Sequence, residues 1–223
     1  MDMRTQVWSP LQNIAVWVGA WLYGHVPSDD LLDAAEELGY GFDLATLQAM
    51  REAPNRPPRV RLLIGGPGQP TGVGGDGLVL PHDEPHLHNV FIAHTDGSWQ
   101  HRVAQVPSED FLSPGDADRL LREATNRAAA QIEALIGHEP PRARNPRLMV
   151  GSLRDFYETP GLPPGTSPRA EKLFARADAV AATIEAVTGL GDHSLDHLIL
   201  GLSRDIRRAR MAGVAYAVVE FSR

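Results

Sequence analysis

The sequence contains no cysteine. This absence excludes disulfides, thiol nucleophiles, cysteine-ligated zinc, iron–sulfur clusters and cysteine redox motifs. Lysine is nearly absent as well, since Lys172 is the only one and the remaining basic residues are arginines. We attribute this imbalance first to the codon bias of a GC-rich genome and not to selection for guanidinium chemistry.

Long apolar runs are also lacking. The run from Ile14 to Tyr23 is shorter than the roughly 20 residues of a membrane-spanning helix, and no clear small-residue cleavage site follows it. The formal net charge of -7 opposes broad binding to phosphate backbones. With 43% hydrophobic and 22% charged residues, the composition is that of a globular protein. We therefore expect a soluble cytoplasmic protein that binds neither membranes nor specific nucleic acid.

Three helices are predicted in the first quarter of the chain. Ser9 and Pro10 are typical of a helix start and predict a helix over 11–23. Ser28 is expected to cap a second helix that Gly39 ends, and a weaker third helix is predicted over 44–53. Near the C-terminus, helices are predicted from Pro114 to Gly137, from Pro168 to Gly189, and from Asp192 or Ser194 almost to the end.

In the middle of the chain, apolar and polar residues alternate as they do in β-strands. Strands are predicted after Arg59, over 78–80, over 89–95 and over 98–106, and a short one over 147–150. Asp96 and Gly97 are typical of a two-residue hairpin turn. That turn pairs His94 with Trp99 and predicts one core-facing row: His88, Val90, Ile92, His94, Trp99, His101 and Val103.

The order of these elements predicts an α+β fold: N-terminal helices, a small mainly antiparallel sheet with a β-hairpin, and C-terminal helices packed on it. The proline-rich stretch 159–168 favours a boundary that divides the chain into a core domain, 1–158, and a C-terminal helical hairpin, 159–223. About 55 residues in two helices offer too little core to stand alone, so we expect the hairpin to dock on the core. A single domain is the alternative.

Histidines gather just before the predicted hairpin. His82, His86 and His88 lie near Asp83 and Glu84, and imidazoles two residues apart on a strand point the same way, so these histidines are candidate metal ligands. A cupin would place a glutamate a few residues after its His-x-His, where Ile92 and its neighbours stand here. A solvated polar loop is therefore the simpler interpretation.

Two further patterns resemble ligand sites incompletely. His193 and His197 have the spacing of a helical zinc pair, but Ser194 stands where a metalloprotease helix has its glutamate. The glycine-rich segment 65–77 follows a strand as phosphate loops do, yet it lacks Gly-Lys-Ser/Thr and contains two prolines that cannot donate. We interpret the first as helix capping and the second as a connection or lid.

Charge is distributed unevenly. Arg204, Arg207 and Arg208 share one predicted helical face and form a candidate anion or partner patch, whereas residues 28–52 carry seven acids against Arg51. Two patches of opposite charge can meet across a domain or subunit contact, although a cluster of charged residues is ordinarily just a solvated face.

The first predicted helix is apolar on every side. Such a helix must be covered on every side, either by the C-terminal helices of the same chain or by a second subunit. In the second case Trp17 and Trp21 are the expected interface residues of a two-fold homodimer, which is the alternative we favour.

No group of residues meets the geometric requirements of an active site. The leading hypothesis is thus a non-catalytic protein that binds a partner, a small molecule or itself and needs no cofactor. The alternative is a metal- or histidine-dependent enzyme that uses a divalent metal at the His82, His86 and His88 loop.

Overall fold

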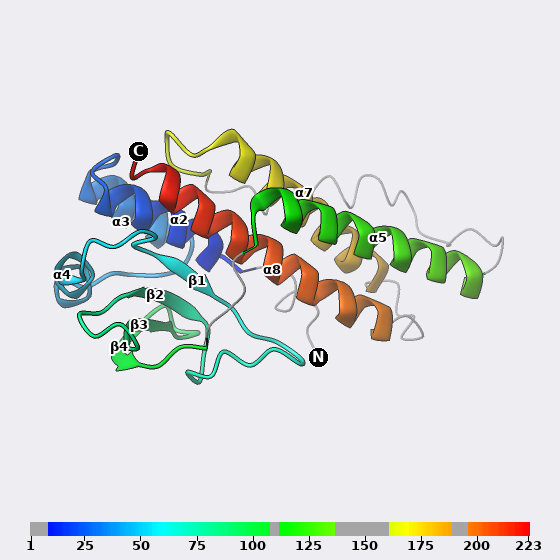
Figure 1. Cartoon of the computed structure of the whole chain (residues 1–223), viewed down its shortest axis with the longest axis horizontal. Coiled ribbons are helices and arrows are strands. Elements are labelled where there is room, and N and C mark those ends of the chain that lie inside the picture. The colour runs from blue at the N-terminus through cyan, green and yellow to red at the C-terminus, as the bar shows by residue number, and fades with distance from the viewer. Residues whose placement is uncertain (1–8, 108–111, 137–160, 189–195) are drawn as a thin grey trace.

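The computed structural model describes residues 9–107, 112–136, 161–188 and 196–223. Within these ranges, six helices accompany a four-stranded antiparallel sheet, which confirms the α+β fold (Figure 1). The predicted boundary at 158 and 159 and the predicted strand over 147–150 lie outside the described residues. The elements are α2 (Leu11–Leu22), α3 (Ser28–Glu37), α4 (Leu44–Glu52), β1 (Arg61–Leu63), β2 (Gly77–Pro81), β3 (His88–Ala93), β4 (Trp99–Ala104), α5 (Pro114–Ile136), α7 (Pro168–Thr188) and α8 (Asp196–Glu220).

The start of α3 differs from the prediction. Ser28 was expected to cap the helix, but Pro27 holds the N-cap position and Ser28 is the first helical residue. The Ser28 hydroxyl instead accepts a hydrogen bond from the indole nitrogen of Trp21 at 3.0 Å. The capping prediction is wrong because this hydroxyl satisfies a buried tryptophan donor from the preceding helix.

The β3–β4 hairpin forms, but its predicted register is wrong by one residue. Ala93 pairs with Trp99 and Phe91 pairs with His101. The connection therefore has five residues. Two backbone hydrogen bonds close it: the nitrogen of His94 donates to the oxygen of Ser98, and the nitrogen of Gly97 donates to the oxygen of His94. Gly97 has a φ of 82°, which glycine adopts without strain.

This register changes which residues share a face. Neighbouring strand positions point to opposite sides of a sheet. His88, Val90 and Ile92 therefore lie on one face, whereas Trp99 and His101 lie on the other. The predicted single core-facing row is wrong. His101 stacks on Phe91 with 4.5 Å between ring centroids, and its Nε2 lies 3.0 Å from Oδ1 of Asn89.

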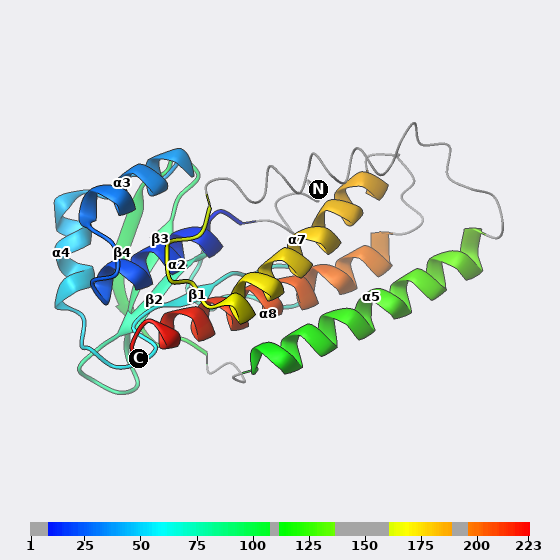
Figure 2. The ribbon, with the colours of Figure 1, turned by 90° about the horizontal axis from the view of Figure 1, so that it is seen from above.

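One face of the sheet packs against helices α2 and α8. Its buried residues join those of both helices in the main core cluster: Leu62, Leu78, Leu80 and Phe91 from the sheet, Ile14, Val16 and Val18 from α2, and Val214, Ala217 and Val218 from α8. Figures 1 and 2 show α8 running from this region to the opposite end of the molecule, beside α5 and α7. A second apolar cluster there joins α5, α7 and α8.

A buried polar junction links α2, α7 and α8. Arg210, with 1% of its surface exposed, donates to Oδ1 of Asp178 at 2.7 Å and to Oε1 of Gln12 at 2.6 Å. Helix α2 therefore shares one charge-assisted hydrogen-bond network with α7 and α8, which lie at the other end of the sequence.

The glycine-rich segment 65–77 lies against α8. The backbone nitrogen of Gly65 donates to Oδ1 of Asp76 at 2.8 Å, and a Cβ added to Gly66 would overlap the guanidinium of Arg207. Burial raises the pKa of Asp76, while the Gly65 amide and Arg207 act in the opposite direction. This segment is thus packed on a buried arginine. Among the described residues, no helix has both the length and the apolar character needed to cross a bilayer.

Candidate functional site

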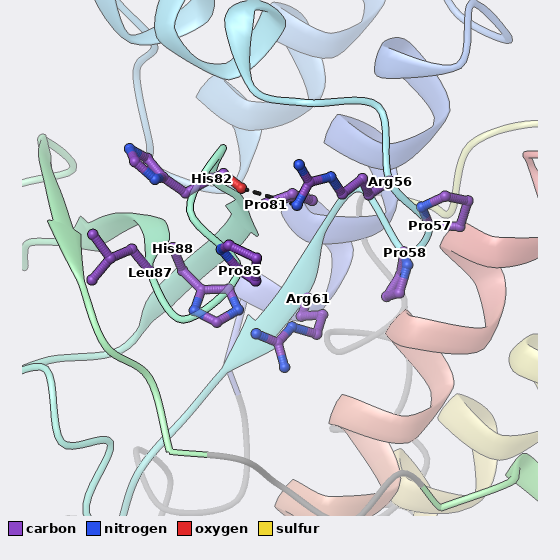
Figure 3. Close-up of a pocket in the computed structure, with 9 residues that line it drawn as sticks. All are labelled: Arg56, Pro57, Pro58, Arg61, Pro81, His82, Pro85, Leu87 and His88. Carbon is purple, nitrogen blue, oxygen red and sulfur yellow. Dashed lines mark hydrogen bonds between the residues drawn. The ribbon is translucent and has the colours of Figure 1, made fainter.

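A basic pocket of about 230 Å³ opens between the α4–β1 connection and the β2–β3 connection (Figure 3). Its walls carry two arginines, two histidines, and an apolar remainder: Arg56, Arg61, His82, His88, Pro57, Pro58, Pro81, Pro85 and Leu87. No carboxylate is among these lining residues. The pocket therefore presents cationic and hydrogen-bonding groups on an apolar base.

Arg56 joins the two connections that form the pocket. Its guanidinium donates to the backbone oxygens of His82 at 3.4 Å and Asp83 at 3.3 Å. The β2–β3 connection also has a hydrogen bond of its own, because the backbone nitrogen of Glu84 donates to Nδ1 of His82 at 3.1 Å. These contacts fix the positions of Arg56 and His82 relative to each other before any ligand enters.

His88 presents a polar atom that the surrounding protein leaves unsatisfied. Its Nδ1 is buried and has no hydrogen-bond partner among the described residues. Figure 3 shows the imidazole beside Pro85 and Arg61. Burial, followed by the charges of Arg61 and His82, lowers the pKa of His88. A buried polar group without a partner is costly, so the local packing leaves one hydrogen bond of His88 unmade.

The structure brings together two of the three histidines predicted as metal ligands. His82 and His88 line the pocket. His86 is exposed instead, and its Nε2 lies 3.4 Å from Oε2 of Glu84. The described residues hold no group of three or more histidine or acidic side chains that could bind a metal ion. The metal-dependent enzyme stays a prediction. His193, of the second histidine pair, lies outside the described residues.

The three predicted patch arginines do not share an exposed surface. Arg204 is exposed and Arg208 half-buried, but Arg207 is only 3% exposed. Burial lowers the pKa of Arg207, and Asp76 partly opposes that shift. Arg207 therefore supports the segment 65–77 from inside the protein.

The predicted interface tryptophans lie on a helix that the same chain covers. α2 contacts α3, α8, β1 and β2. Trp21 is 4% exposed, with the guanidinium of Arg51 4.8 Å from its ring centroid, and half-buried Trp17 donates to the backbone oxygen of Gly161 at 3.0 Å. The same chain thus covers the helix, but of the predicted C-terminal helices only α8 is among these four contacting elements, and α3, β1 and β2 supply the rest. The homodimer and the cytoplasmic location stay predictions.

Sequence reasoning missed Arg56 and Arg61. Both are separated by more than 20 positions from the histidines they accompany, so no local motif joins them. The available signal was the proline-bounded connection before β1, next to arginines that alternate with apolar residues at Arg59 and Arg61.

Comparison with known proteins gives matches over most of the chain. Residues 12–110 match the family model described as Rv1486c-like protein, N-terminal domain, and residues 115–211 match the one described as Rv1486c-like protein, C-terminal domain. A relative from Mycobacterium leprae (strain TN), "Uncharacterized protein ML1804", is 24% identical over 289 aligned residues that cover 93% of this chain and 97% of the relative. No solved structure matches. The chain is therefore similar to Rv1486c-like proteins in both of their domains, in the same order along the sequence.

Proposed function

We propose that this protein acts by binding a small anionic ligand in the basic pocket, without catalytic chemistry of its own. The observation that carries the proposal is the lining of the pocket: among the described residues that form it are Arg56, Arg61, His82 and His88, and the others in that part of the chain are four prolines and a leucine. Guanidinium groups present planar forks of donors that suit oxyanions.

His88 lines the same pocket and supports the same ligand class. A neutral imidazole can donate one hydrogen bond to an oxyanion from the ring nitrogen that carries the proton. Arg56 already donates hydrogen bonds to the β2–β3 connection, so an anion would enter a pocket whose donors are in place. Preorganised donors reduce the cost of ordering side chains on binding.

NMR titration of the protein with inorganic phosphate at fixed ionic strength tests the proposal. We expect saturable shifts in residues of β1, β2 and β3 that line the pocket, and none of comparable size with tetramethylammonium. Arg61→Gln should weaken phosphate binding several-fold, while Arg119→Gln, on the exposed face of α5, should leave it unchanged. Absence of saturable shifts at the pocket, or equal weakening by both substitutions, overturns the proposal.

A further inference from the structure

We infer that the ligand is a small organic phosphate whose phosphate contacts the Arg61 and His88 side of the pocket and whose apolar body lies against the proline wall. This inference rests on the proposed function and specifies the class of ligand. The observation behind it is that five of the nine residues lining the pocket are apolar, and an inorganic ion makes no use of an apolar wall.

The apolar wall comes from both connections. Pro57 and Pro58 lie on the α4–β1 side, and Pro81, Pro85 and Leu87 on the β2–β3 side (Figure 3). Proline side chains have almost no rotamer freedom to lose, so packing a ligand against them costs little conformational entropy. Removing apolar ligand surface from water there contributes roughly 25 cal/mol per Å².

The volume of the pocket sets the size of the ligand. Small-molecule sites commonly have volumes of about 300 to 1,000 Å³, and a water molecule occupies about 30 Å³ of liquid. A volume of about 230 Å³ is small for a drug-sized ligand but larger than one tetrahedral oxyanion requires. The remaining space fits a single ring or a short carbon chain.

The polar side favours phosphate over carboxylate. Arg61 comes from β1 and His88 from β3, so donors approach from more than one direction. A phosphate monoester has three terminal oxygens and a charge of about -1.5 to -2 at pH 7. A carboxylate offers two coplanar oxygens and one charge, and it matches a single guanidinium fork.

Isothermal titration calorimetry with four probes tests this inference: phenyl phosphate, inorganic phosphate, benzoate and phenol. We expect phenyl phosphate to bind about tenfold more tightly than inorganic phosphate, because burying the ring adds roughly 1.4 kcal/mol or more. Benzoate and phenol should bind more weakly than phenyl phosphate. If inorganic phosphate binds as tightly as phenyl phosphate, the ligand does not need an organic body, and only the proposed anion site is retained. If benzoate binds more tightly than phenyl phosphate, the preference for phosphate over carboxylate is refuted.

Two variants separate the two sides of the pocket. Leu87→Ala should weaken phenyl phosphate several-fold and change inorganic phosphate by less than twofold, a selectivity that a general loss of structure does not produce. His88→Gln should weaken both phosphates, whereas His86→Gln, an exposed neighbour outside the pocket lining, should weaken neither. Equal losses for both phosphates in Leu87→Ala overturn the inference, and so do unchanged affinities in His88→Gln. If none of the four probes binds, both the inference and the proposed function are refuted.

Discussion

Breaking the buried ion pair between α7 and α8 should destabilise the protein severely. Asp178→Asn keeps the shape of the side chain but removes the carboxylate charge that faces Arg210. The Asp178 side chain is 6% exposed and that of Arg210 is 1% exposed, and 2.7 Å separates Oδ1 of Asp178 from Nη1 of Arg210. The substitution therefore removes the Asp178 charge from beside a buried guanidinium, while Gln12 still accepts from the same nitrogen.

The expected loss is about 3 to 5 kcal/mol, the usual cost of removing one partner from a buried pair. That loss is a large part of a total stability that is typically about 5 to 15 kcal/mol. Glu123→Gln removes a carboxylate from an exposed pair with Arg119, at 3.0 Å, and should cost less than about 0.5 kcal/mol. Burial, and not the N–O distance, separates the two cases.

Urea denaturation followed by circular dichroism measures both losses. We expect the midpoint of Asp178→Asn to fall while the m value stays unchanged, because the surface exposed on unfolding is the same. Replacing both partners, with Asp178→Leu and Arg210→Met, should recover most of the stability, since the buried charges then disappear together. A loss below about 1 kcal/mol for Asp178→Asn, or a double variant less stable than the single one, refutes this reasoning.

Three further predictions concern the segment 65–77, helix α8 and the sheet. Gly66→Ala should cost about 1 to 3 kcal/mol, because its Cβ would overlap the buried Arg207 guanidinium, and an unchanged urea midpoint would contradict this packing. Gly201→Ala, on α8 with open space around its Cβ, should instead gain about 0.5 to 1 kcal/mol. Burial lowers the pKa of His101, so its NMR titration midpoint should lie below the 6.5 of an unperturbed imidazole. The stability that the neutral ring contributes is then present above pH 6.5 and decreases as the pH falls through the lower folded pKa, and a midpoint at or above 6.5 would show that the ring is not desolvated.

The helices were predictable because their signals are local. Ser113 shows this well: its hydroxyl accepts from the backbone nitrogen of Asp116 at 3.1 Å at the start of α5, as a capping serine should. The hairpin register was not predictable in the same way. Asp96 and Gly97 favour a two-residue turn, but the turn that forms also includes a contact from outside the hairpin, where the Gly41 nitrogen donates to the Gly97 oxygen at 3.2 Å.

The candidate site was only half predictable for a related reason. His82 and His88 are close in sequence and were predicted together with His86, whereas Arg56 and Arg61 join them only when β1 pairs with β2. The helical spacing of Arg204, Arg207 and Arg208 was correct but did not show that α8 is packed on several sides. Depth inside a fold depends on neighbours that a single helix does not encode.

The path of α8 has a consequence for how the protein is synthesised. Met211, Val214, Ala217, Val218 and Phe221 lie in the same apolar cluster as α2 and the sheet, although they follow α5 and α7 in the chain. A ribosome releases α2 and the four strands long before these residues, so the nascent sheet exposes an apolar face until α8 emerges. Folding of the N-terminal half is therefore expected to finish only after the C-terminal helices are made, unlike the domain-by-domain order usual during translation. During that interval a chaperone that covers apolar surface would bind where α8 later packs.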